Sequence, residues 1–271
     1  MIKKLQSIIY KISPVLAIAI ILVFWQIASA AGFVPKFMLP SPADVVIAFF
    51  KDFALLMSHA GTTLTEAFFG LSLGIILGFF VAVLMDRFQI AYKAIYPVLV
   101  ITQTVPTVAI APLLVLWLGY GILPKITLII ITSFFPITIG LLDGFRSADK
   151  DAINLMRAMG ANRMQRFFHI KLPSSMSHFF AGLRISVSYS VIGAVVAEWL
   201  GGFNGLGVYM TRVRKSYSYD KMFAVIFFIS LISLLLMLGV TILQKALMPW
   251  DRGTGKKTNR NTTEQPISNK I

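Results

Sequence analysis

The chain has 271 residues, of which 57% are hydrophobic and 13% are charged, and its mean hydropathy is +0.79. A soluble domain of this length needs more charged residues to cover its surface, so the composition excludes that class and favours an all-helical protein that crosses a membrane several times. The net charge of +14 would indicate nucleic-acid binding in a soluble protein, but in a membrane protein Lys and Arg gather in the inner loops. No nucleic-acid partner is therefore expected. The absence of cysteine excludes disulfides and thiolate metal sites.

The first apolar run covers residues 14–31 and follows a basic N-terminus, 1–13. It is about long enough to cross a hydrocarbon core of ~30 Å, which predicts a first span that begins on the inner side. A cleaved signal peptide is the alternative, because Ala28-Ser29-Ala30 resembles a small-residue cleavage site.

A short amphipathic helix is predicted after this span. Ser41-Pro42-Ala43-Asp44 is typical of a helix start, with a serine cap and proline in the first turn. An apolar stripe follows, formed by Val45, Val46, Phe49, Phe50 and Phe53. The pattern predicts a helix that lies against the outer surface and serves packing rather than binding.

The second and third predicted spans are residues 62–84 and 94–118. In the second, Gly70, Gly74 and Gly78 recur every four residues, which lets another backbone approach closely.

The third span is predicted to be irregular, because Pro106 and Pro112 each remove a backbone hydrogen bond that lipid cannot replace. Polar side chains beside such a break belong where the helix faces protein or water. Gln103 and Thr104 are therefore predicted to face a translocation path, with hydrogen bonding between helices as the alternative.

Three further spans are predicted at 125–142, 183–200 and 222–247. The fifth carries Ser190 and, near its outer end, Glu198. Polar side chains are costly in hydrocarbon, and a carboxylate most of all, so Ser190 and Glu198 are predicted to line the path. Interfacial placement of Glu198 is the alternative. The same two interpretations apply to Glu66 in the second span. Residues 251–271 are polar and aperiodic, which predicts a disordered cytoplasmic tail.

The positions of Lys and Arg support this topology. Three precede the first span, two lie between the second and third, seven lie from Arg146 to Arg184, and six lie from Lys245 onward. Thus 18 of the 25 are assigned to the inner side and 7 to the outer side. This bias predicts six spans with both termini in the cytoplasm.

The longest break between apolar runs, residues 151–173, reads as two short helices and is called the elbow below. Gly160 can end the first helix in the left-handed conformation, Asn162 can cap the second, and Pro173 is expected to end it. The basic residues of the elbow are Arg157, Arg163, Arg166 and Lys171. A structured, basic elbow on the inner side is predicted.

The elbow resembles the signature loop of binding-protein-dependent ABC importer permeases. Gly160, Ile170, Leu172 and Pro173 fall in register with the family pattern, whereas Asn154-Leu155-Met156 stands in place of Glu-Ala-Ala. The resemblance extends from about Leu39 to Trp250. It is similar to the nitrate, sulfonate, taurine and pyrimidine-precursor branch, and most similar to permeases for hydroxymethylpyrimidine, the pyrimidine precursor of thiamine.

This resemblance implies a type I importer permease fold over residues 14–250, with the cytoplasmic coupling loop at 146–182. It implies that two permease copies work in the cell's inner, cytoplasmic membrane with two ATP-binding subunits and an external solute-binding protein. The elbow would dock into a groove of the ATP-binding subunit. The residues assigned to this coupling are Arg157, Ala158, Met159, Gly160, Ala161, Arg163, Leu172 and Pro173.

The function implied is ATP-driven import of a small solute, with a thiamine pyrimidine precursor first and a sulfonate, taurine or nitrate substrate as the alternative. A self-contained secondary transporter is an alternative of another class, but the inverted repeats and charged midplane site typical of that class were not found. The sequence shows no catalytic set and no phosphate-binding loop, so no enzyme activity, cofactor or metal is expected in this chain.

Overall fold

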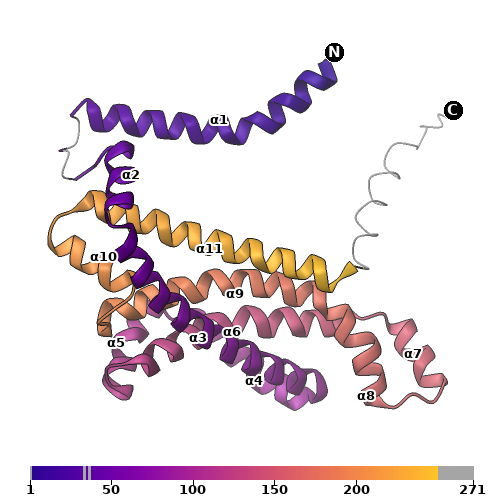
Figure 1. Ribbon diagram of the computed structural model, residues 1–271. Coiled ribbons are helices and arrows are strands. Elements are labelled where there is room, and N and C mark those ends of the chain that lie inside the picture. The colour runs from indigo at the N-terminus through magenta and orange to yellow at the C-terminus, as the bar shows by residue number, and fades with distance from the viewer. Residues whose placement is uncertain (1, 33–34, 36–37, 250–271) are drawn as a thin grey trace, which may run out of the picture. The chain divides into compact units, whose positions relative to one another are not determined.

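The computed structural model describes residues 2–32, 35 and 38–249. Within these ranges the secondary structure consists of helices, which confirms the predicted all-helical class (Figure 1). The predicted disordered tail at 251–271 lies outside the described residues.

Four helical stretches are long and apolar enough to cross a membrane. They are α3 (Phe53–Arg87), α6 (Ile122–Arg146), the stretch Arg163–Gly201 that ends in α9 (Leu172–Gly201), and α11 (Tyr219–Leu247). A bent pair, α4 (Gln89–Thr102) and α5 (Thr107–Leu118), makes a fifth if it counts as one broken span. The apolar part of α1 (Ile2–Ala30) is the shorter segment Val15–Ala30. The described helices therefore give four or five candidate spans by length and composition.

The predicted third span is divided at the proline that marked it as irregular. Residues 103–106 separate α4 from α5, and Pro106 is the last of them. The hydroxyls of Thr102 and Thr104 donate to the carbonyls of Leu99 (2.7 Å) and Ile101 (2.8 Å). These hydroxyls satisfy two backbone carbonyls at the end of α4, so the carbonyls do not need a further helical turn as a hydrogen-bond donor. In addition, a residue that precedes a proline disfavours helical dihedral angles.

The chain forms two compact units. Of the described residues, unit 1 comprises those up to 69 together with 107–128 and 191–232, and unit 2 comprises 70–106, 129–190 and 233–249. Four of the boundaries fall inside α3, α6, α9 and α11, so each of these helices contributes residues to both units.

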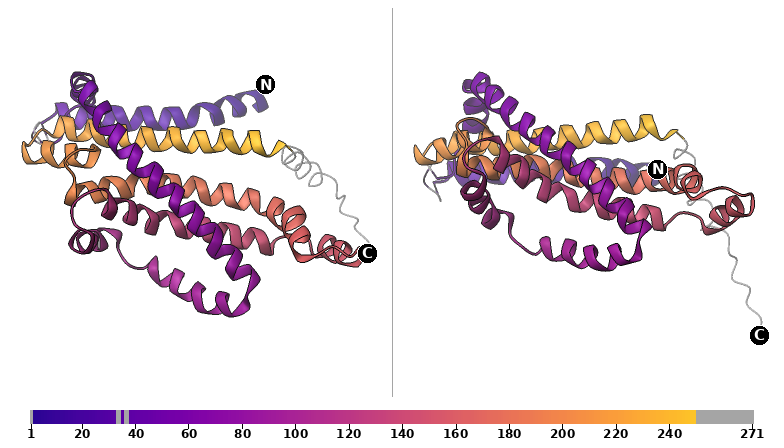
Figure 2. Two further views of the ribbon diagram at one scale, coloured as in Figure 1. Left: turned by 60° about the horizontal axis from the view of Figure 1, so that its bottom comes forward. Right: turned by 90° about the horizontal axis from the view of Figure 1, so that it is seen from below.

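In unit 2, close backbone contacts hold α3, α6 and α9. A Cβ at Gly74 would lie 2.6 Å from Ser133 Oγ, and one at Gly70 would lie 2.5 Å from the side chain of Ile129, which confirms the close approach predicted for the glycine ladder. Between α9 and α6, a Cβ at Gly182 would lie 2.4 Å from the carbonyl oxygen of Pro136. As a result α6 and α9 run side by side in this unit (Figure 2).

In unit 1, the predicted short helix is α2 (Pro42–Lys51). Its capping box is complete, because the Ser41 hydroxyl accepts from the Asp44 N–H and the Asp44 carboxylate accepts from the Ser41 N–H. Val45 and Ala48 are buried and pack with Ala224 of α11. The expected packing role of α2 is confirmed.

Candidate functional site

The first half of the elbow is α7 (Lys150–Ala158), and it ends as predicted. Gly160 has φ +83°, its N–H donates to the Arg157 carbonyl (3.1 Å), and the Ala161 N–H donates to the Met156 carbonyl (2.9 Å). This pair of bonds is a Schellman motif, which needs a left-handed residue and so favours glycine.

The second half begins as predicted but does not end as predicted. Asn162 caps α8 (Arg163–Arg166) in a capping box with Gln165, with N–H to oxygen distances of 2.7 and 2.8 Å. The expectation that Pro173 ends this helix is wrong. A π-helix, η1 (Phe167–Lys171), leads directly into α9, and Pro173 is the second residue of α9.

The π-helix explains how the chain passes this proline. The Leu172 N–H donates to the carbonyl of Phe167, five residues back, so the hydrogen-bond pattern is already shifted where Pro173 contributes no N–H.

The base of the elbow is fixed within unit 2. Lys171 Nζ donates to both carboxylate oxygens of Asp86, at 2.8 Å each, and so ties η1 to the end of α3. The ring of Phe167 lies 5.3 Å from that of Phe145, and Leu172 packs on the same cluster. Of the residues assigned to coupling, Leu172 is therefore a packing group at the base.

The tip of the elbow is exposed. Met159 is 77% exposed, and Arg157, Ala158, Gly160 and Arg163 are exposed with it. Between α7 and the helix that follows, a hollow of about 330 Å³ is lined by six residues, namely Met156, Met159, Gly160, Ala161, Gln165 and His169. A rigid base and an exposed, partly apolar tip with arginines beside it suit contact with another protein.

Of the residues predicted to line a path, Gln103 and Thr104 lie in the break after α4 and are exposed. Gln103 borders a cavity of about 420 Å³ in unit 2, together with Asp143, His178 and Tyr189. Asp143 belongs to α6 and His178 to α9. Their contribution to one cavity depends on the pairing of α6 with α9, which no local pattern shows.

Ser190 and Glu198, the other two residues predicted to line a path, are each 1% exposed. The Ser190 hydroxyl donates to the Val187 carbonyl in its own helix (2.8 Å). Glu198 accepts hydrogen bonds through both carboxylate oxygens, from the Thr63 hydroxyl (2.7 Å) and the Gly207 N–H (2.6 Å). A path role for these two side chains would require a conformation in which they are exposed.

Neither interpretation of Glu66 included the partner that the structure gives it. It forms an ion pair with Lys125 of α6 at 2.5 Å, and the two side chains are 5% and 7% exposed. Its second oxygen, Oε2, is buried and has no hydrogen-bond partner within the described part of the chain. The pair joins residues 59 positions apart.

The start of α10 (Leu206–Lys215) is capped by other helices instead of by its own N-cap residue. The N–H groups of Gly205, Leu206 and Gly207 donate to His59 Nδ1 (3.0 Å), Thr63 Oγ1 (2.9 Å) and Glu198 Oε2, respectively. These three N–H groups would otherwise be unsatisfied at a buried helix start. Glu198 is thus a capping group that binds α10 to α9.

Asp52, at the C-terminal end of α2, joins three elements of unit 1. It accepts from the Tyr209 hydroxyl (2.8 Å) and pairs with Lys221 (2.7 Å). Burial raises the pKa of Asp52, but the bonds from Lys221 and Tyr209 outweigh it and hold the pKa below its ordinary value. Burial and the same carboxylate raise the pKa of Tyr209. The Asp52 contribution to stability is therefore present near neutral pH and is lost as the pH falls through the lowered pKa.

Four or five long apolar helices are the mark of a multi-pass membrane protein, and the family comparison makes this one a transport subunit. Residues 74–250 match the model of the family described as binding-protein-dependent transport system inner membrane component. The chain is 37% identical over 240 residues to the formylaminopyrimidine transport permease protein ThiX of Halalkalibacterium halodurans, covering 88% of this chain and 96% of that protein. It is 31% identical to the riboflavin transport system permease protein RibX of Chloroflexus aurantiacus, covering 86% and 87%.

The fold agrees with two solved structures. An amino acid ABC transporter matches with a TM-score of 0.59 at 16% identity, covering 75% of this chain and 97% of that chain. The MetNI methionine ABC transporter in an inward-facing conformation matches with a TM-score of 0.57 at 19% identity, covering 70% and 93%. The chain belongs to the family of binding-protein-dependent transport system inner membrane components, and it is the permease subunit of an ABC importer.

Proposed function

We propose that this permease imports a pyrimidine precursor of thiamine, delivered by an external binding protein. The observation that carries the substrate class is the 37% identity, over nearly the full length of both chains, to a formylaminopyrimidine permease. A sulfonate, taurine or nitrate substrate is the second candidate, because the taurine permease TauC of Escherichia coli is 29% identical over 86% of this chain.

Uptake separates these candidates. Cells that express the permease with its ATP-binding subunit and binding protein are expected to accumulate labelled formylaminopyrimidine or hydroxymethylpyrimidine, and not taurine. Taurine uptake without pyrimidine uptake would reject the substrate proposal. Pyrimidine uptake by the permease alone, with the ATP-binding subunit omitted, would indicate a secondary transporter instead.

The elbow is proposed to carry the coupling to ATP hydrolysis, which takes place on separate subunits. Transmission of a nucleotide-driven closure needs a stiff element seated in the partner, so that subunit movement becomes helix movement. The Schellman motif, the capping box and the Lys171 ion pair provide that stiffness. Two permease copies, each with an exposed tip, would hold two ATP-binding subunits in the cell's inner membrane.

Six spans with cytoplasmic termini are proposed, with α1 as the first span. In support of a retained α1, the Trp25 indole N–H donates to the Pro40 carbonyl (3.1 Å), and its ring lies 5.6 Å from that of Phe223. Reporters fused after Lys150 and after Arg260 are expected to read as cytoplasmic, and reporters near Asp52 or Tyr217 as external, because of the inner bias of Lys and Arg. An external signal after Lys150 would contradict both the topology and the coupling role of the elbow.

The cavity beside Gln103 is proposed as part of the translocation path. A Gln103→Leu variant is expected to lower pyrimidine uptake several-fold while the ATP-binding subunit still copurifies, because the change removes a polar group from the route without touching the elbow. The matched control is Gln89→Leu, at the exposed start of α4, the helix that precedes Gln103. Equal uptake by both variants would remove Gln103 from the path.

A further inference from the structure

The cavity beside Gln103 is lined by four polar side chains that have no hydrogen-bond partner within the described part of the chain. They are Gln103, Asp143, His178 and Tyr189. All four are exposed, so none of them is committed to packing. At about 420 Å³, the cavity lies within the range of volumes found for small-ligand sites. It can therefore hold a small polar solute and satisfy the hydrogen bonds of that solute.

The floor of this cavity is the close contact between α6 and α9. A Cβ at Gly140 would lie 2.8 Å from the carbonyl oxygen of His178, so the two backbones meet there without a side chain between them. The larger side chains around this contact form apolar walls, namely Phe135, Ile139 and Ile185. Walls of low polarity preserve the electric field of a charged group inside a cleft, which water would otherwise screen.

Asp143 supplies such a charge. It lies in the last turn of α6, and no Lys or Arg of the described chain shares the cavity lining with it. Two arginines of the same helices are held elsewhere, because the Arg146 guanidinium lies 3.9 Å from the centre of the Tyr92 ring and Arg184 donates to the side chain of Gln244. Asp143 forms no ion pair within the described residues. Its negative charge is therefore available to act on a solute.

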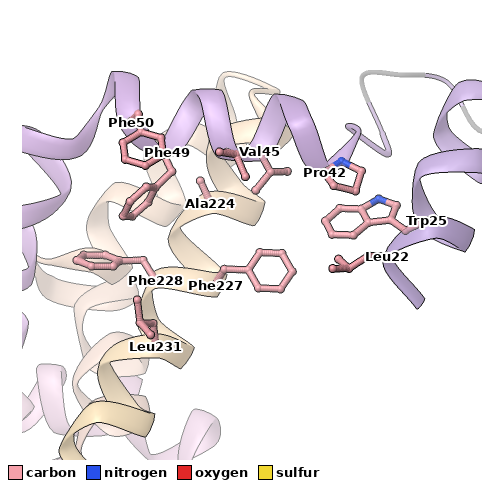
Figure 3. Close-up of a pocket in the computed structure, with 11 residues that line it drawn as sticks. Leu22, Trp25, Pro42, Val45, Phe49, Phe50, Ala224, Phe227, Phe228 and Leu231 are labelled. Atoms are coloured by element: carbon pink, nitrogen blue, oxygen red, sulfur yellow. The ribbon is translucent and has the colours of Figure 1, made fainter. Parts of the chain in front are cut away.

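The cavity of unit 1 between α1, α2 and α11 has a different character. Figure 3 shows Trp25, Phe49, Phe227 and Leu231 around it, and its described lining includes no charged side chain. A polar solute would lose hydrogen bonds to water there without replacement. The cavity of unit 2 is the one whose chemistry suits such a solute.

We propose that the cavity of unit 2 admits neutral and cationic solutes and disfavours anions, and that Asp143 sets this selectivity. The proposal rests on the proposed function, which assigns this cavity to the translocation path. A carboxylate repels a solute of like charge, as the acidic rings of cation-selective channels do. Nitrate and simple aliphatic sulfonates are anions and meet this barrier.

An aminopyrimidine is neutral and meets no such barrier. Its amine lies next to a ring nitrogen, and this pair of donor and acceptor matches the amide of Gln103 in the way that adenine matches a glutamine side chain. The lining of the cavity thus favours the first of the two substrate candidates over the second.

The reactivity of a cysteine in the cavity measures this selectivity without reference to the cargo. The chain has no cysteine of its own, so Ala181→Cys, at an exposed lining position, gives the full-length permease a single thiol. The permease in phosphatidylcholine nanodiscs is treated with two methanethiosulfonate reagents of similar size, one carrying a trimethylammonium group and the other a sulfonate. The ratio of the cationic to the anionic rate is expected to fall about tenfold when Asp143→Asn is added, because the cation loses an attraction and the anion a repulsion. A change in the thiolate fraction would act on both rates alike and cancels in the ratio.

Two further positions make the measurement decisive. Ile185→Cys, one helical turn along α9 and also in the lining, is the second reporter. Gln89→Cys, exposed outside the cavity, is the control, and its ratio is expected to change by less than about twofold because solvent screens the distant charge. An unchanged ratio at both reporters would overturn the proposal. So would a lack of reaction at both while Gln89→Cys reacts, since the cavity would then be closed to solutes.

The reactivity ratio and the uptake assay fail separately. Taurine uptake together with the tenfold fall in the ratio would reject the pyrimidine substrate alone. Pyrimidine uptake together with an unchanged ratio would reject the role of Asp143 alone.

Discussion

A Lys125→Met variant is expected to lower the free energy of unfolding by about 3–5 kcal/mol, because it leaves a buried carboxylate without its partner. The Lys125 ammonium lies 2.5 Å from Glu66 and both side chains are almost completely buried. Unfolding of the purified permease in mixed detergent micelles measures the change.

Two further variants decide whether the pair is responsible. The double variant Lys125→Met with Glu66→Met replaces both charges by apolar groups and is expected to lie within about 1 kcal/mol of the parent, or above it, since such a replacement also removes the unpaired oxygen of Glu66. Lys171→Met breaks the more accessible pair with Asp86 and is expected to cost about 1 kcal/mol or less. A loss in the double variant as large as in Lys125→Met would show that the ion pair is not the cause.

A Gly160→Val variant is expected to reduce uptake about tenfold while the protein inserts normally. Valine at φ +83° costs on the order of 1 kcal/mol or more through the clash of its Cβ with the backbone, and a shift of about 1.4 kcal/mol away from the docked conformation is a factor of ten. Beyond the two adjacent residues, no atom of the described part of the chain lies within 4 Å of the position that this Cβ would take, so the strain is confined to the backbone of the tip. Uptake and copurification of the ATP-binding subunit are the measurements.

Gly119→Val supplies the matched control, because Gly119 also has a positive φ (+76°) and open space at its Cβ but lies after α5, outside the elbow. It should keep the ATP-binding subunit bound and uptake close to the parent. A Gly160→Asn variant should retain most of the activity, since asparagine tolerates the left-handed region. Normal uptake in Gly160→Val would reduce the elbow to a connector.

Features with a local cause were predictable from the sequence. The cap at Ser41, the left-handed Gly160 and the cap at Asn162 each depend only on residues within five positions along the chain. The structure has all three features. The break near Pro106 was expected for the same reason, since a missing N–H acts on its own turn.

Features that depend on tertiary pairing were not predictable. Glu66 and Thr63 both belong to α3. Glu66 pairs with Lys125 of α6, and Thr63 donates a hydrogen bond to Glu198 of α9, only because these helices, distant in sequence, pack against α3. The role of Glu198 was therefore assigned from its cost in lipid alone, whereas its contacts make it a cap for α10. Pro173 was assigned as a helix end because proline normally interrupts the helical hydrogen bonds. The π-turn that lets the helix continue through Pro173 has no simple sequence pattern, so it was not predicted.

That π-turn also determines where the elbow points. Each residue of an α-helix advances the side-chain direction by about 100°, so the extra residue in Phe167–Lys171 turns α8 relative to the thirty residues of α9 that follow. A single-residue deletion in this segment would restore the ordinary turn and rotate the whole tip, with Arg157, Gly160 and Arg163 intact. The orientation of the tip relative to α9 is thus encoded in the number of residues at its base, separately from the chemistry at the tip.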